Sequence, residues 1–271
     1  MRSTLPILPP GASLTRLAAE VERLESRDEP TDPPPDLALG WPGPDTAIGG
    51  GLRWGALHEG ISGAAQGDDQ NSPSRQSWPP ALSVLSHIGG RALRADTRGR
   101  CAVWVGRRVW PYGPALGALG PLLARSLFIA PGDLPQRVWA IDLALRCQGV
   151  GVVIADGSGF GMSETRRLQL AASNTGALCL LARPWPEHKH ISAAWTRWSV
   201  APTPSDTTDP RWNVELLRCK GMRPTTEEAR RWSVQRAHET DDVRETGDVR
   251  LVPGVQRGRD QATRPALRAF G

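Results

Sequence analysis

Residues 49–63 read GGGLRWGALHEGISG, a glycine-rich turn followed by a short apolar strand that we expect over Ala56–His58. In nucleotide-binding α/β proteins such a strand leads directly into the loop that holds the phosphates. Here it leads into AAQGDDQNSPSRQSWPP at residues 64–80, which contains no G-x-x-x-x-G-K-S/T motif and no lysine. A phosphate loop needs that lysine to contact the β- and γ-phosphates and the hydroxyl to hold Mg²⁺. The sequence therefore predicts the framework of an ATPase with a degenerate phosphate loop.

Residues 37–185 alternate short apolar runs with amphipathic stretches, which predicts an α/β fold with a mostly parallel central sheet flanked by helices. The run VGVVIA at 150–155 is apolar on both faces, as a central parallel strand must be. The other strands are expected at Cys101–Val105, Ser126–Ala130, Val150–Ala155 and Ala177–Leu181. The helices are expected at Ala81–Leu93, Leu134–Cys147 and Ser163–Ala172, the last with Ser163 as N-cap, Glu164 in its first turn, and Leu168, Leu170 and Ala171 on its buried face.

After Pro184 the pattern changes to apolar residues that alternate with polar ones, around Trp198, Trp212 and Trp232. This period of two predicts half-buried, antiparallel strands that extend the sheet towards the C-terminus. The alternating positions also place Trp104, Trp198, Trp212 and Trp232 in the core. By contrast, the proline-rich surroundings of Trp41, Trp78 and Trp110 make those three the candidates for a contact surface.

The chain of 271 residues is long enough for one large core with peripheral ends. We expect residues 1–36 to form an amphipathic helix over 12–27 and a proline-rich linker, RDEPTDPPPD at 27–36. Residues 37–237 are expected to form the core, and residues 238–271 a flexible segment with one weak strand at Val249–Val252. The sequence leaves open whether the N-terminal helix packs on its own domain or docks on a partner.

The charge pattern gives little support to a nucleic-acid interface. The 33 basic residues include only two lysines, Lys189 and Lys220, and 28 acidic residues are interspersed, so the formal net charge is +5. A mixed-charge surface is favoured over a clustered nucleic-acid footprint. The four cysteines lie far apart, which predicts buried, reduced thiols rather than a zinc site. Because the sequence shows neither a signal peptide nor an apolar run of 18 residues, we expect a cytoplasmic protein.

The order of several segments resembles the core of RecA recombinases. The matching segments are PDTAIGGGLRWGALHEGISG at 44–63, CAVWVGRR at 101–108, SLFIAPGD at 126–133, VGVVIADG at 150–157 and SETRRLQLAASNTGALCLLARP at 163–184. GALHEG at 55–60, TRRLQLAAS at 165–173, TRW at 196–198 and RWNVELLR at 211–218 are more closely similar to the ImuA family, the RecA-like proteins of bacterial SOS mutagenesis cassettes. The resemblance covers about residues 37–220 and implies a RecA-like core.

The resemblance also shows which parts of the ATPase machinery are missing. The phosphate-binding lysine has no counterpart, and Arg107 stands where RecA has its catalytic glutamate. A guanidinium cannot serve as the base that orients an attacking water. Asp156 matches the magnesium-linked aspartate, although an acidic residue after a strand is commonly a turn cap. A replacement cation from Arg75 or Arg91 finds no support in their spacing, so we expect no catalytic residue, cofactor or metal.

Histidines were the remaining candidates for chemistry. His188 and His190 flank Lys189 on the stretch that corresponds to the second DNA-binding loop of RecA. With no third ligand nearby, a solvated loop is favoured over a metal site. Glu59, next to His58 at the end of the first strand, is interpreted as a structural hydrogen-bonding residue.

Two functions follow from the resemblance. The first is a non-catalytic accessory protein of SOS-induced, error-prone translesion DNA synthesis, with ImuB, an error-prone DNA polymerase and RecA as implied partners. Contact with DNA is expected to be indirect, and no membrane association is expected. The alternative is an inhibitor of cell division similar to SulA, which is also RecA-like and lacks a working phosphate loop.

Overall fold

The computed structural model describes residues 35–63, 80–117, 119–206, 210–221 and 230–235. The helix predicted over 12–27, most of the degenerate loop at 64–80, Trp78 and the strand predicted at Val249–Val252 lie outside these ranges. None of the described helices is long and apolar enough to cross a membrane.

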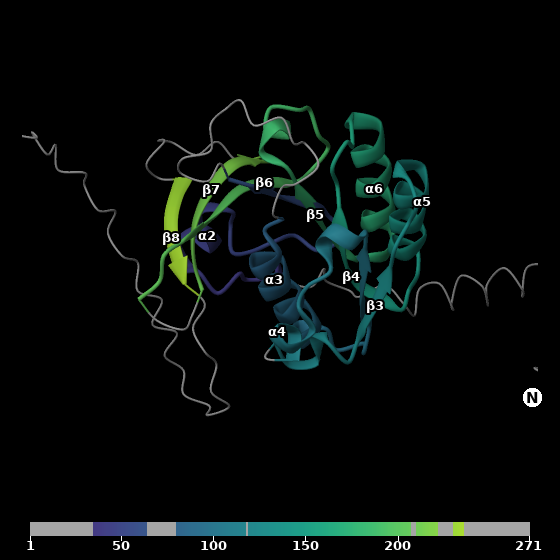
Figure 1. The fold of residues 1–271 in the computed structure, drawn as a ribbon, viewed down its shortest axis with the longest axis horizontal. Coiled ribbons are helices and arrows are strands. Elements are labelled where there is room, and N and C mark those ends of the chain that lie inside the picture. The colour runs from purple at the N-terminus through teal and green to yellow at the C-terminus, as the bar shows by residue number, and fades with distance from the viewer. Residues whose placement is uncertain (1–34, 64–79, 118, 207–209, 222–229, 236–271) are drawn as a thin grey trace, which may run out of the picture. The chain divides into compact units, whose positions relative to one another are not determined.

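Eight strands form one sheet in the order β3-β2-β4-β5-β1-β6-β7-β8 (Figure 1). The first six strands in this order run parallel, and β7 and β8 are added antiparallel. The fold is therefore the predicted α/β architecture with an antiparallel C-terminal extension. The strands are β1 Leu57–Ser62, β2 Cys101–Val105, β3 Ser126–Ile129, β4 Val150–Asp156, β5 Leu178–Arg183, β6 Thr196–Thr203, β7 Arg211–Cys219 and β8 Arg231–Gln235.

Three strand predictions need correction. β1 extends four residues beyond the predicted end at His58, and β5 continues to Arg183 rather than Leu181. Each extension contains a fully buried charged residue, Glu59 in β1 and Arg183 in β5, and the two form an ion pair. Because hydrophobicity alone was used to predict the strand ends, both strands were predicted to end too early. β6 was expected to be antiparallel but pairs parallel with β1. The chain crosses over between β5 and β6, and this crossover gives β6 the direction of β1.

Helices cover both faces of the sheet (Figure 1). The helix α3 packs on one face with Trp104 and Leu180, whereas α5 and α6 pack on the other with Val153 and Leu181. Each face thus has its own apolar layer, as a mostly parallel sheet requires. The helices are α2 Pro42–Ala47, α3 Leu82–Ala95, α4 Gly113–Gly117, α5 Leu134–Leu145 and α6 Met162–Thr175, with short 3₁₀ turns η1 Arg107–Val109, η2 Gly120–Leu122 and η3 Trp185–Glu187.

The start and the buried face of α6 differ from the prediction. Gly161 is the N-cap residue, and its N–H donates to the carboxylate of Glu164 at 2.8 Å, so Ser163 lies inside the first turn. Leu168 and Ala171 are buried as expected, but Leu170 is 54% exposed. Two residues of α-helix correspond to a rotation of about 200°, which places Leu170 opposite Leu168.

Among the described tryptophans for which the sequence made a prediction, one departs from it. Trp104, Trp198 and Trp212 are buried and Trp232 is half-buried in the core, while Trp110 is 42% exposed. Trp41 was expected at a contact surface but is only 3% exposed and stacks on His87, with 5.1 Å between ring centroids. Trp41 is the N-cap residue of α2, which begins at Pro42, and its ring packs against His87 and Trp212 in the core rather than facing outwards.

The cysteines are only partly buried. Cys179 and Cys219 are buried, Cys101 is half-buried, and Cys147 is exposed in the turn between α5 and β4. The expectation of four buried thiols is therefore wrong for Cys147, because α5 ends at Leu145, before this residue.

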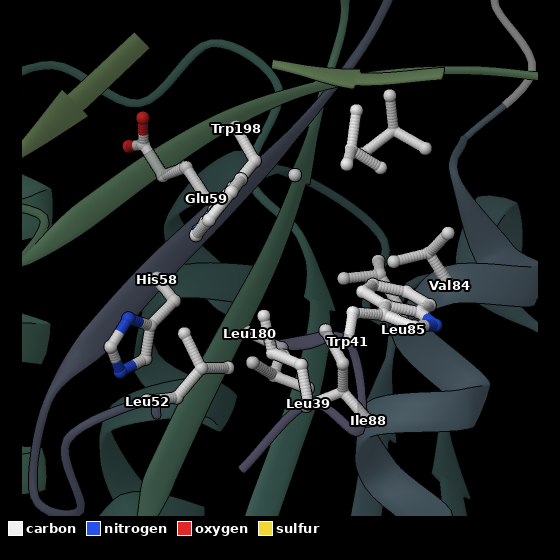
Figure 2. A pocket seen from close by; sticks show the side chains of 13 residues that line it. Leu39, Trp41, Leu52, His58, Glu59, Val84, Leu85, Ile88, Leu180 and Trp198 are labelled. Atoms are coloured by element: carbon white, nitrogen blue, oxygen red, sulfur yellow. The ribbon is translucent and has the colours of Figure 1, made fainter. Parts of the chain in front are cut away.

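A small internal cavity of about 30 Å³ lies between α3 and the middle of the sheet (Figure 2). Its walls are apolar and include Leu85 and Ile88 from α3 and Trp198 and Val200 from β6. Figure 2 shows the carboxylate of Glu59 directed away from these apolar side chains. Because the cavity offers no polar partners for a water, it is a packing defect rather than a ligand site.

Replacing Leu85 by Ala should enlarge this cavity and lower the free energy of unfolding by about 3 kcal/mol, the usual cost of a buried leucine. The measurement is denaturant unfolding of the purified protein. Leu143→Ala is the matched control because Leu143 is 53% exposed on α5, and it should cost less than about 0.5 kcal/mol. Equal losses in the two variants would contradict the packing described here.

Candidate functional site at the carboxyl edge of the sheet

The carboxyl ends of the parallel strands meet at one edge, which is where open α/β sheets bind ligands. β1 ends there at Ser62, just before residues 64–79, and β4 ends at Asp156. β2 ends at Val105 and is followed by Gly106 and Arg107. The structure therefore brings Arg107 and Asp156, which the sequence comparison singled out, to the ends of neighbouring strands.

Gly106 makes the turn after β2 possible. Its φ is +100°, and a Cβ at this position would lie 3.0 Å from the Cβ of Asp156. Glycine alone adopts this conformation readily and leaves room for the close approach. Arg107 follows in η1, is exposed, and forms no ion pair with any described residue.

Both carboxylate oxygens of Asp156 are occupied by groups of the protein itself. Oδ2 lies 3.0 Å from a guanidinium nitrogen of Arg137 and 3.6 Å from one of Arg108. Oδ1 accepts a hydrogen bond of 2.9 Å from the backbone N–H of Ser158. A magnesium ion at this carboxylate would have to displace two guanidinium groups, so the arrangement disfavours a divalent cation. The turn-capping role considered for Asp156 is present in the bond to Ser158.

Glu59 is fully buried on β1 and is the centre of a second ionic group. Its Oε1 accepts hydrogen bonds from Arg183 at 2.8 Å and from the hydroxyl of Ser192 at 2.6 Å. Its Oε2 accepts one from Arg197 at 2.6 Å. A buried carboxylate is tolerable only with such compensation, so Glu59 is a structural residue, as the sequence indicated.

The two arginines extend this group to the segment between β5 and β6. Arg183 also donates to Glu187 at 2.7 Å and to the carbonyl of Phe160 at 2.6 Å. Burial alone would lower the pKa of Arg183, but the carboxylates of Glu59 and Glu187 outweigh it, and the pKa of the guanidinium is raised. Arg183 therefore stays charged inside the protein.

Arg197 holds the backbone of the same segment. It donates to the carbonyl oxygens of His188 at 3.0 Å, His190 at 2.9 Å and Glu187 at 3.2 Å. The carbonyl of Glu187 also accepts the backbone N–H of His190 at 3.0 Å. Together with the three bonds from Arg197, this bond fixes the path of the chain from Glu187 to His190. This segment is the part of the chain for which the sequence resemblance implied correspondence with the second DNA-binding loop of RecA.

The histidines of this segment do not form a metal site. His188 stacks on Trp185 with 4.2 Å between centroids, and its Nδ1 lies 2.8 Å from the carbonyl of Trp185. Within the described ranges, no group of three or more His, Cys, Asp or Glu side chains is placed to hold a metal ion.

His58 is buried on the opposite face of β1. Its Nε2 lies 3.0 Å from the carbonyl of Arg53, which can only accept, so Nε2 carries the proton. Nδ1 then accepts from the hydroxyl of Thr196 at 2.8 Å. Burial lowers the pKa of His58 to about 4, against a partial rise from the bond to Arg53. The ring is neutral and serves to join β1 to β6.

Sequence reasoning missed the partners of the two carboxylates, Arg137, Arg183, Arg197 and Ser192. A usable signal was present in one of them. Arg183 ends the apolar run LCLLAR, and a cation in such a strand must be paired. Arg197 gave no such signal, because in the alternating pattern around Trp198 it takes the place of a polar neighbour. Arg137 gave no signal, because it lies in a separate element, α5, 19 residues before Asp156 in the sequence.

Comparison with known proteins agrees with the fold described above. No protein-family model matches the chain. Among solved structures, the RadB recombinase is similar with a TM-score of 0.50 and 12% identity, over 73% of this chain and 95% of that chain. At this identity the match shows the fold alone, and the chain is a RecA-like α/β protein.

A closer relationship appears among curated proteins. Protein ImuA of Caulobacter vibrioides, from strain NA1000 / CB15N and from strain ATCC 19089 / CIP 103742 / CB 15, is 34% identical over 209 residues. The match covers 71% of this chain and 82% of the relative. The chain belongs to the ImuA family, which confirms the resemblance drawn from the sequence.

Replacing Arg183 by Met should lower the free energy of unfolding by about 3–5 kcal/mol, because Glu59 loses one of its two buried cations. Arg231→Met is the matched control. Arg231 pairs with Glu215 at 3.1 Å but its side chain is 59% exposed, so its loss should cost at most about 1 kcal/mol. Urea unfolding measures both, and a similar cost for the two variants would contradict the structural role of Glu59.

The depressed pKa of His58 makes stability depend on pH. The unfolded state binds a proton at this ring near pH 6.5 and the folded state only near pH 4, so stability falls as the pH falls through this range. Between pH 7 and pH 4 the wild type should lose about 3 kcal/mol more than His58→Asn, which has no titratable ring. Parallel pH profiles of the two proteins would refute the burial of a neutral ring.

Proposed function

We propose that this chain is a non-catalytic, RecA-like accessory protein in SOS-induced, error-prone translesion DNA synthesis. In this proposal it acts through contacts with ImuB, an error-prone DNA polymerase, RecA, or a combination of them. Membership of the ImuA family and the RecA-like fold support the connection with DNA damage.

The single observation that carries the non-catalytic part is the environment of Asp156. Its carboxylate is already paired with Arg137 and Arg108. By the resemblance to RecA, the neighbouring Arg107 stands in place of the catalytic glutamate. Together with the missing lysine in residues 64–80, three separate parts of the ATPase machinery are changed. Three such changes favour a protein that binds without turning over nucleotide.

The ordered segment between β5 and β6 supports the same conclusion. Arg197 donates hydrogen bonds to its backbone carbonyl groups, and Arg197 is itself paired with the carboxylate of Glu59. A segment fixed in this way does not need a nucleotide to position it. The RecA-like surface can then bind a partner whether or not a nucleotide is present.

The first test is nucleotide binding and hydrolysis. We expect no saturable binding of a fluorescent ATP analogue in the presence of Mg²⁺, and no release of phosphate with single-stranded DNA, because the γ-phosphate lacks its cation and the metal lacks its ligand. RecA serves as the positive control. DNA-stimulated hydrolysis of ATP that disappears in Asp156→Ala would contradict the proposal.

The second test separates the two cellular roles. Deletion of the gene should abolish mutations induced by DNA damage, and the purified protein should bind ImuB. Overexpression should leave cell length unchanged. Long undivided cells on overexpression, with damage-induced mutation intact in the deletion strain, would support the inhibitor of cell division instead.

A further inference from the structure

The exposed apolar side chains of the described structure are concentrated around one edge of the sheet. Nine of the twelve large ones lie between Trp110 and Leu143. They belong to β3, to the segment before it and to α5, which lie next to one another at that edge (Figure 1). The nine are Trp110, Tyr112, Leu123, Leu127, Phe128, Ile129, Leu134, Trp139 and Leu143. Phe128 contacts Trp110 on one side of the edge, and Ile129 lines a groove with Trp139 and Leu143 on the other. Exposed apolar side chains gathered around one edge in this way indicate an interaction surface.

The strand β3 is an edge strand without the usual protection. It pairs with β2 on one side, and no described strand pairs with its other side. Its sequence, SLFI, contains neither a charge nor a proline. The carbonyl groups of Arg125 and Ile129 point to β2, so by alternation the N–H and C=O of Phe128 point away from it. An open apolar edge of this kind is a template for another strand.

A groove of about 370 Å³ runs beside this edge, between β3 and α5. Ile129 forms its strand side, Trp139 and Leu143 form its helix side, and Cys147 also lines it. Leu127 lies on the same face of β3 as Ile129, because the two are two residues apart. A strand added to β3 would therefore place every second side chain towards this groove.

The charges around the patch select the kind of partner. Between residues 97 and 150 the chain has seven arginines and two aspartates. Three of the carboxylates nearby are each paired with two guanidinium groups: Asp96 with Arg100 and Arg125, Asp142 with Arg146 and Arg167, and Asp156 with Arg108 and Arg137. Asp133 instead caps the start of α5 by accepting from the N–H of Gln136. A net positive surface repels a second copy of itself and attracts acidic residues.

We propose that the open edge of β3 and the adjoining groove bind an extended segment of a partner protein, with alternating apolar residues flanked by acidic ones. The segment adds a strand to β3 through Phe128, inserts apolar side chains between Ile129 and Trp139, and places its carboxylates against the surrounding arginines. The inference rests on the proposed function, because it assigns the surface through which a partner of translesion synthesis is held.

The test uses the full chain with purified ImuB and RecA as probes, and dissociation constants measured by biolayer interferometry. Trp139→Glu and Leu143→Glu place like-charged carboxylates in the groove and should weaken binding at least tenfold. Leu170→Glu, a similarly exposed position on α6, is the matched control and should bind as the wild type does. Melting temperatures check that all three variants are folded.

The edge itself is tested by a second pair of variants. Phe128→Pro removes the outward N–H, and Phe128→Ala keeps it, while both lose the same ring and its stacking on Trp104. Binding should be at least tenfold weaker in the proline variant than in the alanine variant. Equal binding by this pair would show that no strand is added at β3.

Cys147 gives a readout that needs no change in the groove. It is the exposed thiol of the four, so its labelling by a maleimide, in a Cys101→Ser background, should slow at least tenfold when the partner is bound. If the wild type binds neither ImuB nor RecA, the proposed function fails. If it binds one of them while the groove variants bind equally well and Cys147 stays reactive, only the docking surface is wrong. If Cys147 becomes protected without a partner as the protein concentration rises, the occupant of the groove is a second copy of this chain and not an acidic segment of a partner.

Discussion

The ion pairs of one buried carboxylate hold the carboxyl edge of this protein together. Glu59 lies in β1 with no exposure to solvent, and it joins Arg183 of β5 to Arg197 of β6. These two strands flank β1, so the three central strands of the sheet share one ionic group. The same arginines bind the backbone and the carboxylate of the segment between β5 and β6. Its path therefore depends on Glu59.

The same arrangement recurs elsewhere in the described structure. Asp96, Asp142 and Asp156 are each paired with two guanidinium groups, as Glu59 is. Arginine suits this role because its planar fork donates several hydrogen bonds and its charge survives burial. In a chain with only two lysines, arginines thus pair with the buried carboxylates, including Glu59 and, at the carboxyl edge, Asp156. A site of this kind has little to offer a magnesium ion or a nucleotide, and this favours a protein that works by binding.

Sequence reasoning recovered the elements built on apolar runs and failed where buried charges carry the structure. VGVVIA fixed β4 and CAVWV fixed β2, because hydrophobic strands are read directly from composition. The ends of β1 and β5 were missed because Glu59 and Arg183 look like surface residues until they are seen as a pair. The direction of β6 depends on the crossover before it, and the ion pair of Arg137 with Asp156 joins separate elements. Neither the direction of β6 nor this ion pair can be read from a local sequence pattern.

The central claim is that the carboxyl edge is closed by these ion pairs and takes no nucleotide. A crystal structure of the protein grown in millimolar Mg²⁺ and ATP tests it most directly. The account predicts that Asp156 keeps its contacts with Arg137 and Arg108, that Glu59 stays between its two arginines, and that no phosphate density follows β1. A magnesium ion on Asp156, with Arg137 displaced and phosphates bound after Ser62, would contradict it.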